Sequence, residues 1–366
     1  MSSLYIHIPF CHHKCLYCSF YSVAQKYDTN LYVERLIKEL CERQNFIDNN
    51  LQTIYFGGGT PSLLSLTQIE KILLAIENTY SISNVKETTF EINPENADKE
   101  YLIGLKNLGI NRLSIGIESF DAEDLRLLNR SHTSLQAKQS IENAINTGFE
   151  NISIDLICNL PFSSFEKWKN NLQTFINYDL THISCYTLMI ETGTMLEKLI
   201  QKGKYNPVSE EYAIKEFDYT MQTLEKHNYL HYETSSYAKH GYKSQHNLTY
   251  WTFQPYLGIG AGAHSYNGKV RQWNKNDING YFIGNILQSE NLTTLDKYHE
   301  YIMLSARMQN GLNKSYVQNH FPEFYNKFSI NCNSMIQQGF LNNDLSLTSK
   351  GWHLQDTLIL ELCSIE

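Results

Sequence analysis

Residues 4–18, LYIHIPFCHHKCLYC, are the most informative segment of the sequence. Its first five residues form a β-rich run that ends at Pro9, and a loop with three cysteines follows, at Cys11, Cys15 and Cys18. Three thiolates on one short loop can converge on one metal centre. A structural zinc site would need a fourth protein ligand, whereas a four-iron cluster held by three cysteines keeps one iron open to an external ligand. The sequence therefore predicts a metal or iron–sulfur site directly after the first strand.

The residues around these cysteines have simpler roles. Adjacent residues of one tight loop are badly placed to complete a tetrahedron, so we expect a solvated rim at His12, His13 and Lys14. The other five cysteines stand singly in apolar segments and are expected to pack as buried thiols: Cys41, Cys158, Cys185, Cys332 and Cys363.

Composition excludes several classes of protein. Of the 366 residues 42% are hydrophobic and 19% charged, which excludes disorder. The net charge of −8 gives no general basic footprint, so we expect no nucleic-acid partner. The sequence lacks an apolar run long enough to span a membrane, and its start does not look like a signal peptide. We expect a cytoplasmic protein with at most peripheral membrane contact.

The first half of the chain alternates strand and helix signals. Six β-rich runs stand at residues 4–8, 53–56, 88–92, 113–117, 152–158 and 183–188. Their mostly continuous apolar character is expected where both faces of a parallel sheet are covered. Helical spacing of apolar residues separates them, and Thr67–Glu70 is a capping-box sequence. Six βα units within about 190 residues predict an α/β fold with a partial (βα)6 TIM-like barrel.

The pattern changes after Gly193. One long helix is predicted over 210–226, and 229–242 is rich in tyrosine and serine and looks irregular or strand-like. From Thr294 onward helical stretches lead to a small β-wing near 339–348. We therefore predict three parts: a barrel over 1–190, a middle segment over 191–290, and a helical, winged-helix-like C-terminal region over 291–366.

Polar and glycine residues cluster where the predicted strands end, which is where barrels bind ligands. The second strand runs into Gly57-Gly58-Gly59-Thr60-Pro61, and single polar residues follow at Glu91, Glu118, Arg130 and Asp155. Glycines let backbone N–H groups approach a ligand closely, although a tight turn alone would also explain them. Each charged residue could equally belong to a structural ion pair, such as Asp155 with Arg130.

The cysteine spacing, with Tyr17 directly before Cys18, resembles the radical S-adenosylmethionine (SAM) superfamily. The resemblance implies a [4Fe-4S] cluster held by the three cysteines, with SAM on the fourth iron through its amino and carboxylate groups. An electron from such a cluster cleaves SAM to a 5′-deoxyadenosyl radical, while the protein supplies geometry and excludes water. The resemblance also implies SAM contacts at Tyr5, Tyr17, Gly57, Gly58, Gly59, Thr60, Glu91, Glu118, Arg130 and Asp155. Glu118 departs from the family pattern, since this branch usually carries glutamine there.

The segment from Tyr5 to Cys11 narrows the branch. It resembles the oxygen-independent coproporphyrinogen III oxidases and their relatives, the HemW-type haem chaperones. The oxidases carry a fourth cysteine at the position of Phe20 and a long arm before the cluster, and this chain reaches Cys11 almost at once. Both features favour the chaperone over the alternative, an oxidase that decarboxylates coproporphyrinogen III. A third hypothesis is a zinc-stabilised scaffold protein.

The last motif is His246-Asn247-Leu248-Thr249-Tyr250-Trp251. A neutral imidazole is the common axial ligand of haem iron, although a lone histidine among aromatic residues is more often structural. The string resembles the HNxxYW signature of the haem-chaperone branch. This resemblance implies haem binding by His246, Asn247, Tyr250 and Trp251, with His264 a weaker candidate. It also implies three partners: haem or another porphyrin, an acceptor haemoprotein and an electron-donor protein.

Overall fold

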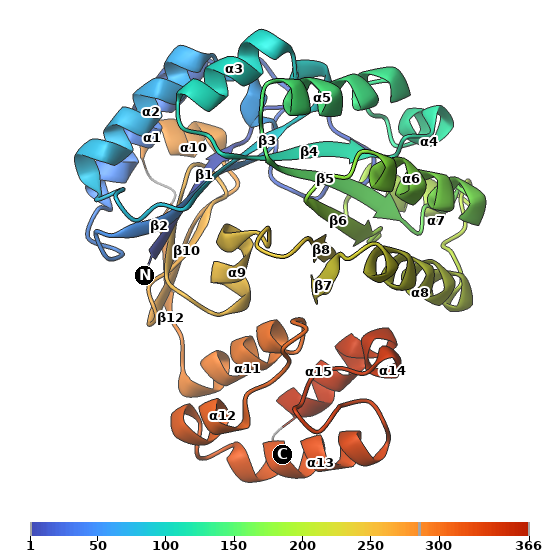
Figure 1. Cartoon of the computed structure of the whole chain (residues 1–366). Helices are drawn as coiled ribbons and strands as arrows, with labels where there is room; N and C mark the ends of the chain where they lie inside the picture. The colour runs from blue at the N-terminus through green and yellow to red at the C-terminus, as the bar shows by residue number, and fades with distance from the viewer. Residues whose placement is uncertain (1, 285–286, 365–366) are drawn as a thin grey trace.

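The computed structural model describes residues 2–284 and 287–364, and its main feature is one twelve-stranded sheet (Figure 1). The strands are β1 (Ser2–Ile8), β2 (Leu51–Gly58), β3 (Glu87–Ile92), β4 (Arg112–Glu118), β5 (Asn151–Cys158), β6 (His182–Thr187), β7 (Leu230–Glu233), β8 (Ser236–Ala238), β9 (Tyr256–Ile259), β10 (His264–Tyr266), β11 (Val270–Asn274) and β12 (Leu287–Asn291). Their order across the sheet is β12-β11-β10-β9-β1-β2-β3-β4-β5-β6-β8-β7. The sheet stays open, as a partial barrel requires, and β1 to β6 are the six predicted strands.

Helices connect the strands and form the C-terminal region. They are α1 (Thr29–Glu42), α2 (Leu66–Thr79), α3 (Lys99–Asn107), α4 (Ala122–Leu127), α5 (Ser134–Asn146), α6 (Phe165–Asn177), α7 (Met195–Gln201), α8 (Glu210–Lys226), α9 (Gln245–Trp251), α10 (Ile278–Ile283), α11 (Thr294–Ser305), α12 (Lys314–His320), α13 (Tyr325–Gln337), α14 (Ser349–His353) and α15 (Gln355–Cys363). Parallel strands need such crossovers, and the helices between β1 and β6 cover the outer face of these strands (Figure 1). No helix within the described ranges combines the length and apolarity needed to cross a bilayer.

The start of α2 differs from the sequence prediction. The capping box predicted at Thr67–Glu70 is wrong, because the cap is Ser65 and the box partner is Gln68. Ser65 has an extended backbone, and its side chain accepts from the Gln68 N–H while the Gln68 side chain caps the Ser65 N–H. Thr67 already lies inside the first turn, so its hydroxyl cannot act as an N-cap.

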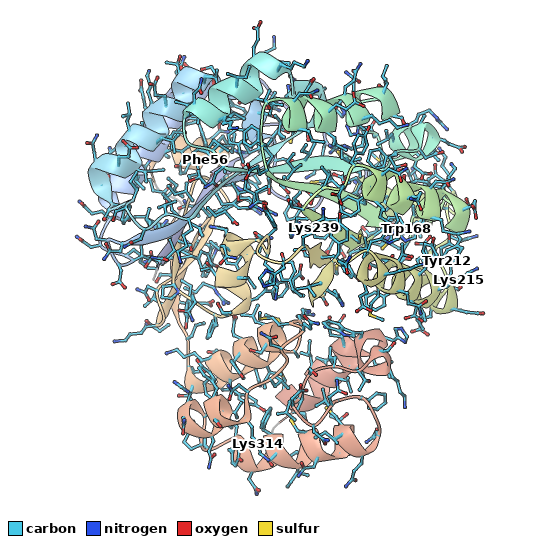
Figure 2. The ribbon with its side chains drawn as sticks, viewed as in Figure 1. Phe56, Trp168, Tyr212, Lys215, Lys239 and Lys314 are labelled. Atoms are coloured by element: carbon cyan, nitrogen blue, oxygen red, sulfur yellow. The ribbon has the colours of Figure 1, made fainter. Side chains whose placement is uncertain are left out.

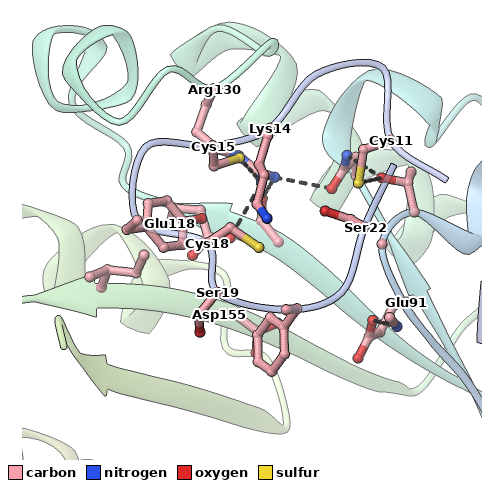
Figure 3. A pocket seen from close by; sticks show the side chains of 18 of the residues that line it. Cys11, Lys14, Cys15, Cys18, Ser19, Ser22, Glu91, Glu118, Arg130 and Asp155 are labelled. Atoms are coloured by element: carbon pink, nitrogen blue, oxygen red, sulfur yellow. Dashed lines mark hydrogen bonds and ion pairs between the residues drawn. The ribbon is translucent and has the colours of Figure 1, made fainter. Parts of the chain in front are cut away.

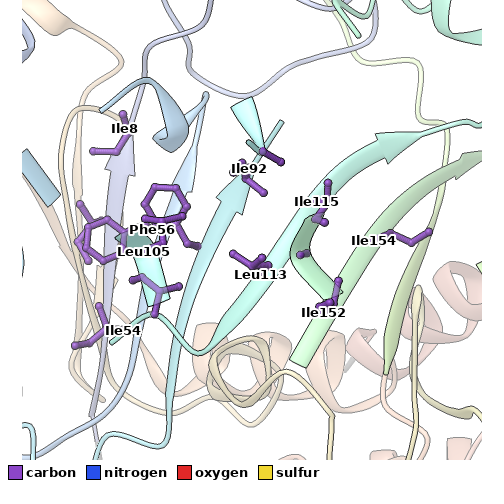
Figure 4. Close-up of a cluster of buried hydrophobic side chains, with 14 of the residues drawn as sticks. Ile8, Ile54, Phe56, Ile92, Leu105, Leu113, Ile115, Ile152 and Ile154 are labelled. Carbon is purple, nitrogen blue, oxygen red and sulfur yellow. The ribbon is translucent and has the colours of Figure 1, made fainter. Parts of the chain in front are cut away.

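The two faces of the parallel strands have opposite character. The outer face is apolar and packs against the helices, with Ile54, Phe56, Leu113 and Ile115 in the core (Figure 4). Polar side chains alternate with them and point inward. At the amino ends of the strands they form what we call the barrel floor: Ser3, Thr53, Glu87, Arg112, Ser153 and His182, all buried. The predicted continuous apolar runs are therefore alternating strands with a buried polar inner face.

Residues beyond 190 complete the same sheet and core. Strand β9 pairs in parallel with β1, and β8 pairs antiparallel with β6, so the middle segment extends both edges. Leu257, Ile259 and Tyr237 share the barrel core. Helix α8, predicted with its observed bounds, packs on α6, where the Trp168 indole N–H donates to the Thr220 hydroxyl at 2.8 Å (Figure 2). The sheet and the core thus continue across residue 190, and the three-part division stays a prediction.

The C-terminal helices α11 to α15 form a bundle with a hydrophobic core of its own. The predicted β-wing is reduced to one antiparallel bridge, between Leu341 and Leu347. The bundle lies beneath the barrel on the side of α9 (Figure 1), and α11 contacts α9 directly. Backbone hydrogen bonds join the two parts, from the Thr234 N–H to the Arg307 carbonyl at 2.9 Å and from the Gln309 N–H to the Tyr232 carbonyl at 3.1 Å. Helix α9 is therefore held between the barrel and the bundle.

Candidate functional site

A cavity of about 460 Å³ opens at the carboxyl ends of the parallel strands (Figure 3). It is lined by eleven of the residues predicted for the cluster and for SAM: Cys11, Cys15, Tyr17, Cys18, Gly58, Gly59, Thr60, Glu91, Glu118, Arg130 and Asp155. Two predicted SAM residues, Tyr5 and Gly57, are not among the residues that line this cavity. The fold thus brings together residues that are up to 144 positions apart in the sequence.

Backbone hydrogen bonds hold the cysteine loop in place at its start and again between Cys15 and Cys18. The Cys11 N–H donates to the Val23 carbonyl at 3.0 Å, and the Val23 N–H donates to the Pro9 carbonyl at 2.7 Å. Farther along, the Leu16 N–H donates to the Leu128 carbonyl at 3.2 Å, next to the end of α4. The loop is therefore tied both to the end of β1 and to the α4 region.

Hydrogen-bond donors already face two of the sulfurs. The Thr60 hydroxyl lies 3.6 Å from the Cys11 Sγ, and Nη1 of Arg130 lies 3.5 Å from the Cys15 Sγ. Burial raises the pKa of the Cys15 thiol, and it raises the pKa of Cys18 to about 11. Donors aimed at sulfur stabilise thiolate and are one way in which a protein tunes an iron–sulfur cluster. The donor set fits a cluster that these cysteines bind with loss of their protons.

The geometry of the thiols also bears on the kind of metal centre. Within residues 2–284 and 287–364, no three His, Cys, Asp or Glu side chains are arranged to hold a metal ion. In a four-iron cluster each cysteine binds a different iron, so the thiolates do not have to meet at one point.

Arg130 organises the wall beside Cys15. Its Nη2 donates to the Gly116 carbonyl at 2.8 Å and to Oδ1 of Asn93 at 3.0 Å. The ion pair considered for Asp155 with Arg130 is not the one that forms, because Arg130 pairs with Glu118 at 3.6 Å. Burial opposes the charge of Arg130, yet the nearby Tyr17, Glu118 and Cys15 raise its pKa, so the guanidinium stays charged.

Glu118 itself has an uncommon backbone. Its φ of 62° lies in the left-handed region, and the register between β4 and β5 shifts at this point. The bend directs the carboxylate toward Arg130, and the Tyr17 side chain also hydrogen-bonds to it. A residue that departs from the family pattern is thus part of the cavity wall and holds the arginine beside the cluster loop.

The glycine loop is shaped by the end of β1. Gly58 has a φ of +116°, and a Cβ added there would lie 2.5 Å from the His7 ring. The Gly58 N–H donates to Oε2 of Glu91 at 3.0 Å, while the Tyr55 hydroxyl donates to Oε1 at 2.8 Å. Gly59 donates its N–H to the Ile8 carbonyl at 2.8 Å. The glycines therefore allow a close approach between strands and also orient the Glu91 carboxylate.

Three carboxyl groups give the cavity an acidic wall. Burial raises the pKa of Glu91 and of Glu118. Burial, and then the charges of Glu118 and Glu91, raise the pKa of Asp155 to about 7. SAM carries two positive charges, on its sulfonium and its ammonium, and one carboxylate. Acidic groups next to the charged Arg130 suit such a ligand, so the residues present fit the cofactor.

The haem-motif residues lie elsewhere, at the barrel floor. His246 is fully buried (0% exposed), whereas Asn247, Tyr250 and Trp251 are half-buried on α9. Because the Thr53 hydroxyl donates to Ser3 at 2.8 Å, its oxygen accepts from the His246 Nδ1–H, also at 2.8 Å. The other ring nitrogen, Nε2, then accepts from the Tyr250 hydroxyl at 2.8 Å.

Two further observations describe the histidines of this region. Burial and then the charge of Arg112 lower the pKa of His246 to about 3, so its imidazole is neutral. The weaker candidate, His264, is exposed and stacks beside Trp273 with ring centroids 6.1 Å apart. The fold therefore separates the predicted haem residues from the cavity.

Sequence reasoning missed several residues of the site. The cavity is also lined by Asn93, Ser114, Tyr186 and Met189. Tyr55 was missed as well, and its hydroxyl donates a hydrogen bond to Glu91. Ser114 and Tyr186 could have been predicted, because side chains alternate between the two faces of a strand and these two alternate with core positions. The register that brings them to one wall is not visible in any single strand.

Comparison with known proteins gives the family of this chain. Residues 5–175 match the Radical SAM superfamily. The chain is 34% identical over 362 residues to the haem chaperone HemW of Lactococcus lactis, covering 96% of this chain and 95% of that protein. It is 35% identical over 317 residues to HemW of Escherichia coli, covering 84% and 82%.

A solved structure supports the fold. Coproporphyrinogen III oxidase (HemN) of Escherichia coli, described as a radical SAM enzyme, superposes with a TM-score of 0.84. The superposition covers 99% of this chain and 90% of that one at 21% identity, so the likeness concerns the fold alone. With the cysteine loop and the acidic cavity in place and the similarity to HemW running along nearly the whole sequence, the chain belongs to the HemW family of radical SAM proteins.

Proposed function

We propose that this protein binds haem and passes it to acceptor haemoproteins in the cytoplasm. The observation that carries the proposal is the 34% identity, over 96% of the chain, to a relative named a haem chaperone. Phe20 supports the choice, since it stands where the oxidase branch has a fourth cysteine and lies 70% exposed at the cavity. The alternative, a coproporphyrinogen III oxidase, is not favoured by the relatives that cover the chain.

The cavity is the proposed binding site for the cofactors of the radical SAM family. Cys11, Cys15 and Cys18 would hold the [4Fe-4S] cluster, which supplies an electron when a donor protein reduces it. Glu91 and Asp155 would bind the cationic groups of SAM, and Arg130 would keep a positive charge beside the cluster loop. Backbone hydrogen bonds hold the cysteine loop to β1 and to the α4 region, so the chain itself would orient the cluster beside these charged groups.

We further propose that His246 is the haem ligand, with Asn247, Tyr250 and Trp251 around it. In the structure its imidazole is enclosed, so binding an iron requires α9 to move away from the barrel floor. The neutral ring has the lone pair that iron needs, but Nε2 uses it to accept from the Tyr250 hydroxyl. Haem iron must therefore displace that hydroxyl.

A haem titration tests the proposal. Haem would be added to anaerobically reconstituted wild type, His246→Ala, His264→Ala and His240→Ala, the last being an exposed histidine near β8 as a matched control. We expect the same Soret band in the wild type, in His264→Ala and in His240→Ala. In His246→Ala we expect a band shifted from that of the wild type and at least tenfold weaker haem binding. An unchanged spectrum and affinity in that variant would remove His246 as the ligand, and no haem uptake by the wild type would contradict the function.

The oxidase alternative is tested in the same preparation. The reduced protein would be incubated with SAM and coproporphyrinogen III, and the porphyrin products would be separated. We expect no protoporphyrinogen above the level of a Cys15→Ser control. If protoporphyrinogen forms well above the level of the Cys15→Ser control, the protein is an oxidase and the proposal of a chaperone that does not catalyse this reaction is refuted.

A further inference from the structure

A continuous set of contacts links the predicted haem ligand to the cavity wall. The His246 ring packs against the Tyr55 ring with centroids 4.9 Å apart. The Tyr55 hydroxyl donates to Oε1 of Glu91 at 2.8 Å, and Oε2 of Glu91 accepts the Gly58 N–H at 3.0 Å. Glu91 and Gly58 line the cavity, whereas His246 lies at the floor. Three successive contacts therefore span the barrel from floor to cofactor site.

The position of Tyr55 depends on what lies beneath it. Its ring also contacts Tyr5, with centroids 6.0 Å apart, and the Tyr5 ring lies 6.4 Å from the His246 ring. A Cβ added at Gly57 would lie 2.8 Å from Tyr55 and 2.9 Å from Glu91, so the hydroxyl, the carboxylate and the glycine loop are tightly packed. Removing the imidazole leaves a space into which Tyr55 can shift, and the Glu91 carboxylate then loses a donor.

Helix α9 is anchored so that His246 stays in the barrel. The buried Glu87 carboxylate accepts from the backbone N–H groups of Gln245 and His246, both at 2.9 Å. An anion at the N-terminus of this short helix satisfies donors that the helix itself leaves free. The same carboxylate therefore holds the start of α9 and the backbone of its histidine at the barrel floor.

We propose that His246 is a positioning residue for SAM, and that haem and SAM compete for it. In one state the imidazole lies under Tyr55 and supports the Glu91–Gly58 edge of the cavity. In the other it has left the floor to bind haem, and that edge loses its support. Bound SAM then favours the inward state and drives the release of haem to an acceptor. The haem half rests on the proposed function, whereas the positioning half does not.

Thermodynamic linkage makes the proposal quantitative. Two ligands that select different positions of one residue weaken each other, and each does so by the same factor. Couplings of this kind commonly change affinities about 5- to 150-fold. Because a tilted ring contact and one hydrogen bond, both through Tyr55, carry the link from His246 to Glu91, we expect the low end, about five- to tenfold.

The positioning role is tested without haem. SAM affinity would be measured by equilibrium dialysis on the reconstituted full-length chain, for wild type, His246→Ala, His246→Gln and the exposed control His240→Ala. We expect about five- to tenfold weaker SAM binding in His246→Ala and none of this loss in His240→Ala. His246→Gln should recover part of the affinity, because its amide can still bond to Thr53. Wild-type SAM affinity in His246→Ala would overturn the positioning role.

A double variant tests the route through Tyr55. Tyr55→Phe keeps the ring but removes the hydrogen bond to Glu91, so it should also weaken SAM binding. If His246 acts through that bond, the double variant His246→Ala/Tyr55→Phe binds SAM no more weakly than the weaker single variant. Losses that multiply would overturn the route, because two independent defects add in free energy.

The competition is tested on the wild type alone. Haem would be titrated into reconstituted protein with and without saturating SAM, and SAM into protein with and without haem. We expect each ligand to weaken the other by the same factor, about five- to tenfold. Equal haem affinities with and without SAM would overturn the competition. A wild type that takes up no haem would instead refute the proposed function, and the haem-free SAM measurements would still decide the positioning role.

Discussion

At the scale of single residues, the carboxyl group of Asp155 is the group best placed to make the site depend on pH. It lies on the cavity wall and accepts from the Ser114 hydroxyl at 3.3 Å, with Ser184 as a second donor. Burial and the neighbouring Glu118 and Glu91 raise its pKa to about 7. Near neutral pH the wall therefore carries a carboxyl that is only half ionised.

SAM affinity should consequently fall as the pH falls through 7. Only ionised Asp155 attracts the cationic groups of SAM, so binding favours loss of its proton and acid opposes binding. Between pH 8 and pH 6 we expect up to roughly tenfold weaker binding by the wild type, and a flatter profile for Asp155→Asn. Equilibrium dialysis of the reconstituted protein at several pH values measures both profiles. Equal slopes in the two proteins would contradict the assignment to Asp155.

At the scale of elements, the turn after β2 is shaped by the strand beside it. The φ of +116° at Gly58 is strained for any residue with a side chain, and the His7 ring fills the space where a Cβ would stand. The same backbone N–H holds the Glu91 carboxylate. One residue thus joins the packing of two strands to the orientation of a cavity group.

Gly58→Ala should therefore lose both stability and SAM affinity. Gly241→Ala is a matched control, because Gly241 also has a positive φ, +88°, but a Cβ added there would meet no atom within 4 Å among the described residues. We expect about 1 kcal/mol lost in the control and about 2 to 4 kcal/mol in Gly58→Ala, measured by denaturant unfolding. SAM binding should weaken only in Gly58→Ala. Equal losses in the two variants would show that the contact with His7 does not matter.

At the scale of the whole molecule, the barrel and the C-terminal bundle have separate cores and meet around α9. Arg271 of β11 reaches across to Glu300 of α11 at 2.6 Å. The His353 imidazole of α14 bonds to Asp218 of α8 at 2.7 Å. Polar links, backbone bonds and ring contacts such as His231 with Trp352, whose centroids are 4.6 Å apart, therefore join the bundle to the barrel.

Arg271→Ala should loosen this connection. The control is Arg307→Ala, which breaks an ion pair of the same length, 2.6 Å to Asp356, that lies within the bundle; both arginines are 25% exposed. Hydrogen exchange read by mass spectrometry should rise up to about fivefold in α9 and α11 for Arg271→Ala, with β1 to β6 unchanged. If the two variants exchange alike at α9, the pair to Glu300 does not hold the bundle in place.

The features that depend on neighbours along the chain could be predicted from the residues alone. The six strands, the bounds of α8 at Glu210–Lys226 and the spacing of three cysteines on one loop follow from periodicity and short-range order. Glycine and charged residues at strand ends predicted a cavity there, because parallel strands all end at one edge. The N-cap of α2 was nevertheless predicted two residues too late. Ser65 and Thr67 each carry a hydroxyl three residues before a Gln or Glu, and only the extended backbone at Ser65 shows which of them caps the helix.

The contacts between residues far apart in the sequence could be seen only in the folded chain. Arg130 pairs with Glu118 and not with Asp155, because the left-handed backbone at Glu118 directs its carboxylate toward the guanidinium. His246 of the histidine motif lies at the barrel floor. It forms a hydrogen bond with Thr53, which is 193 positions away in the sequence. No local pattern encodes such a contact, because it depends on register, crossover and the packing of α9 against the sheet. That packing places the predicted haem ligand beneath the proposed SAM site and makes His246 a candidate for both functions.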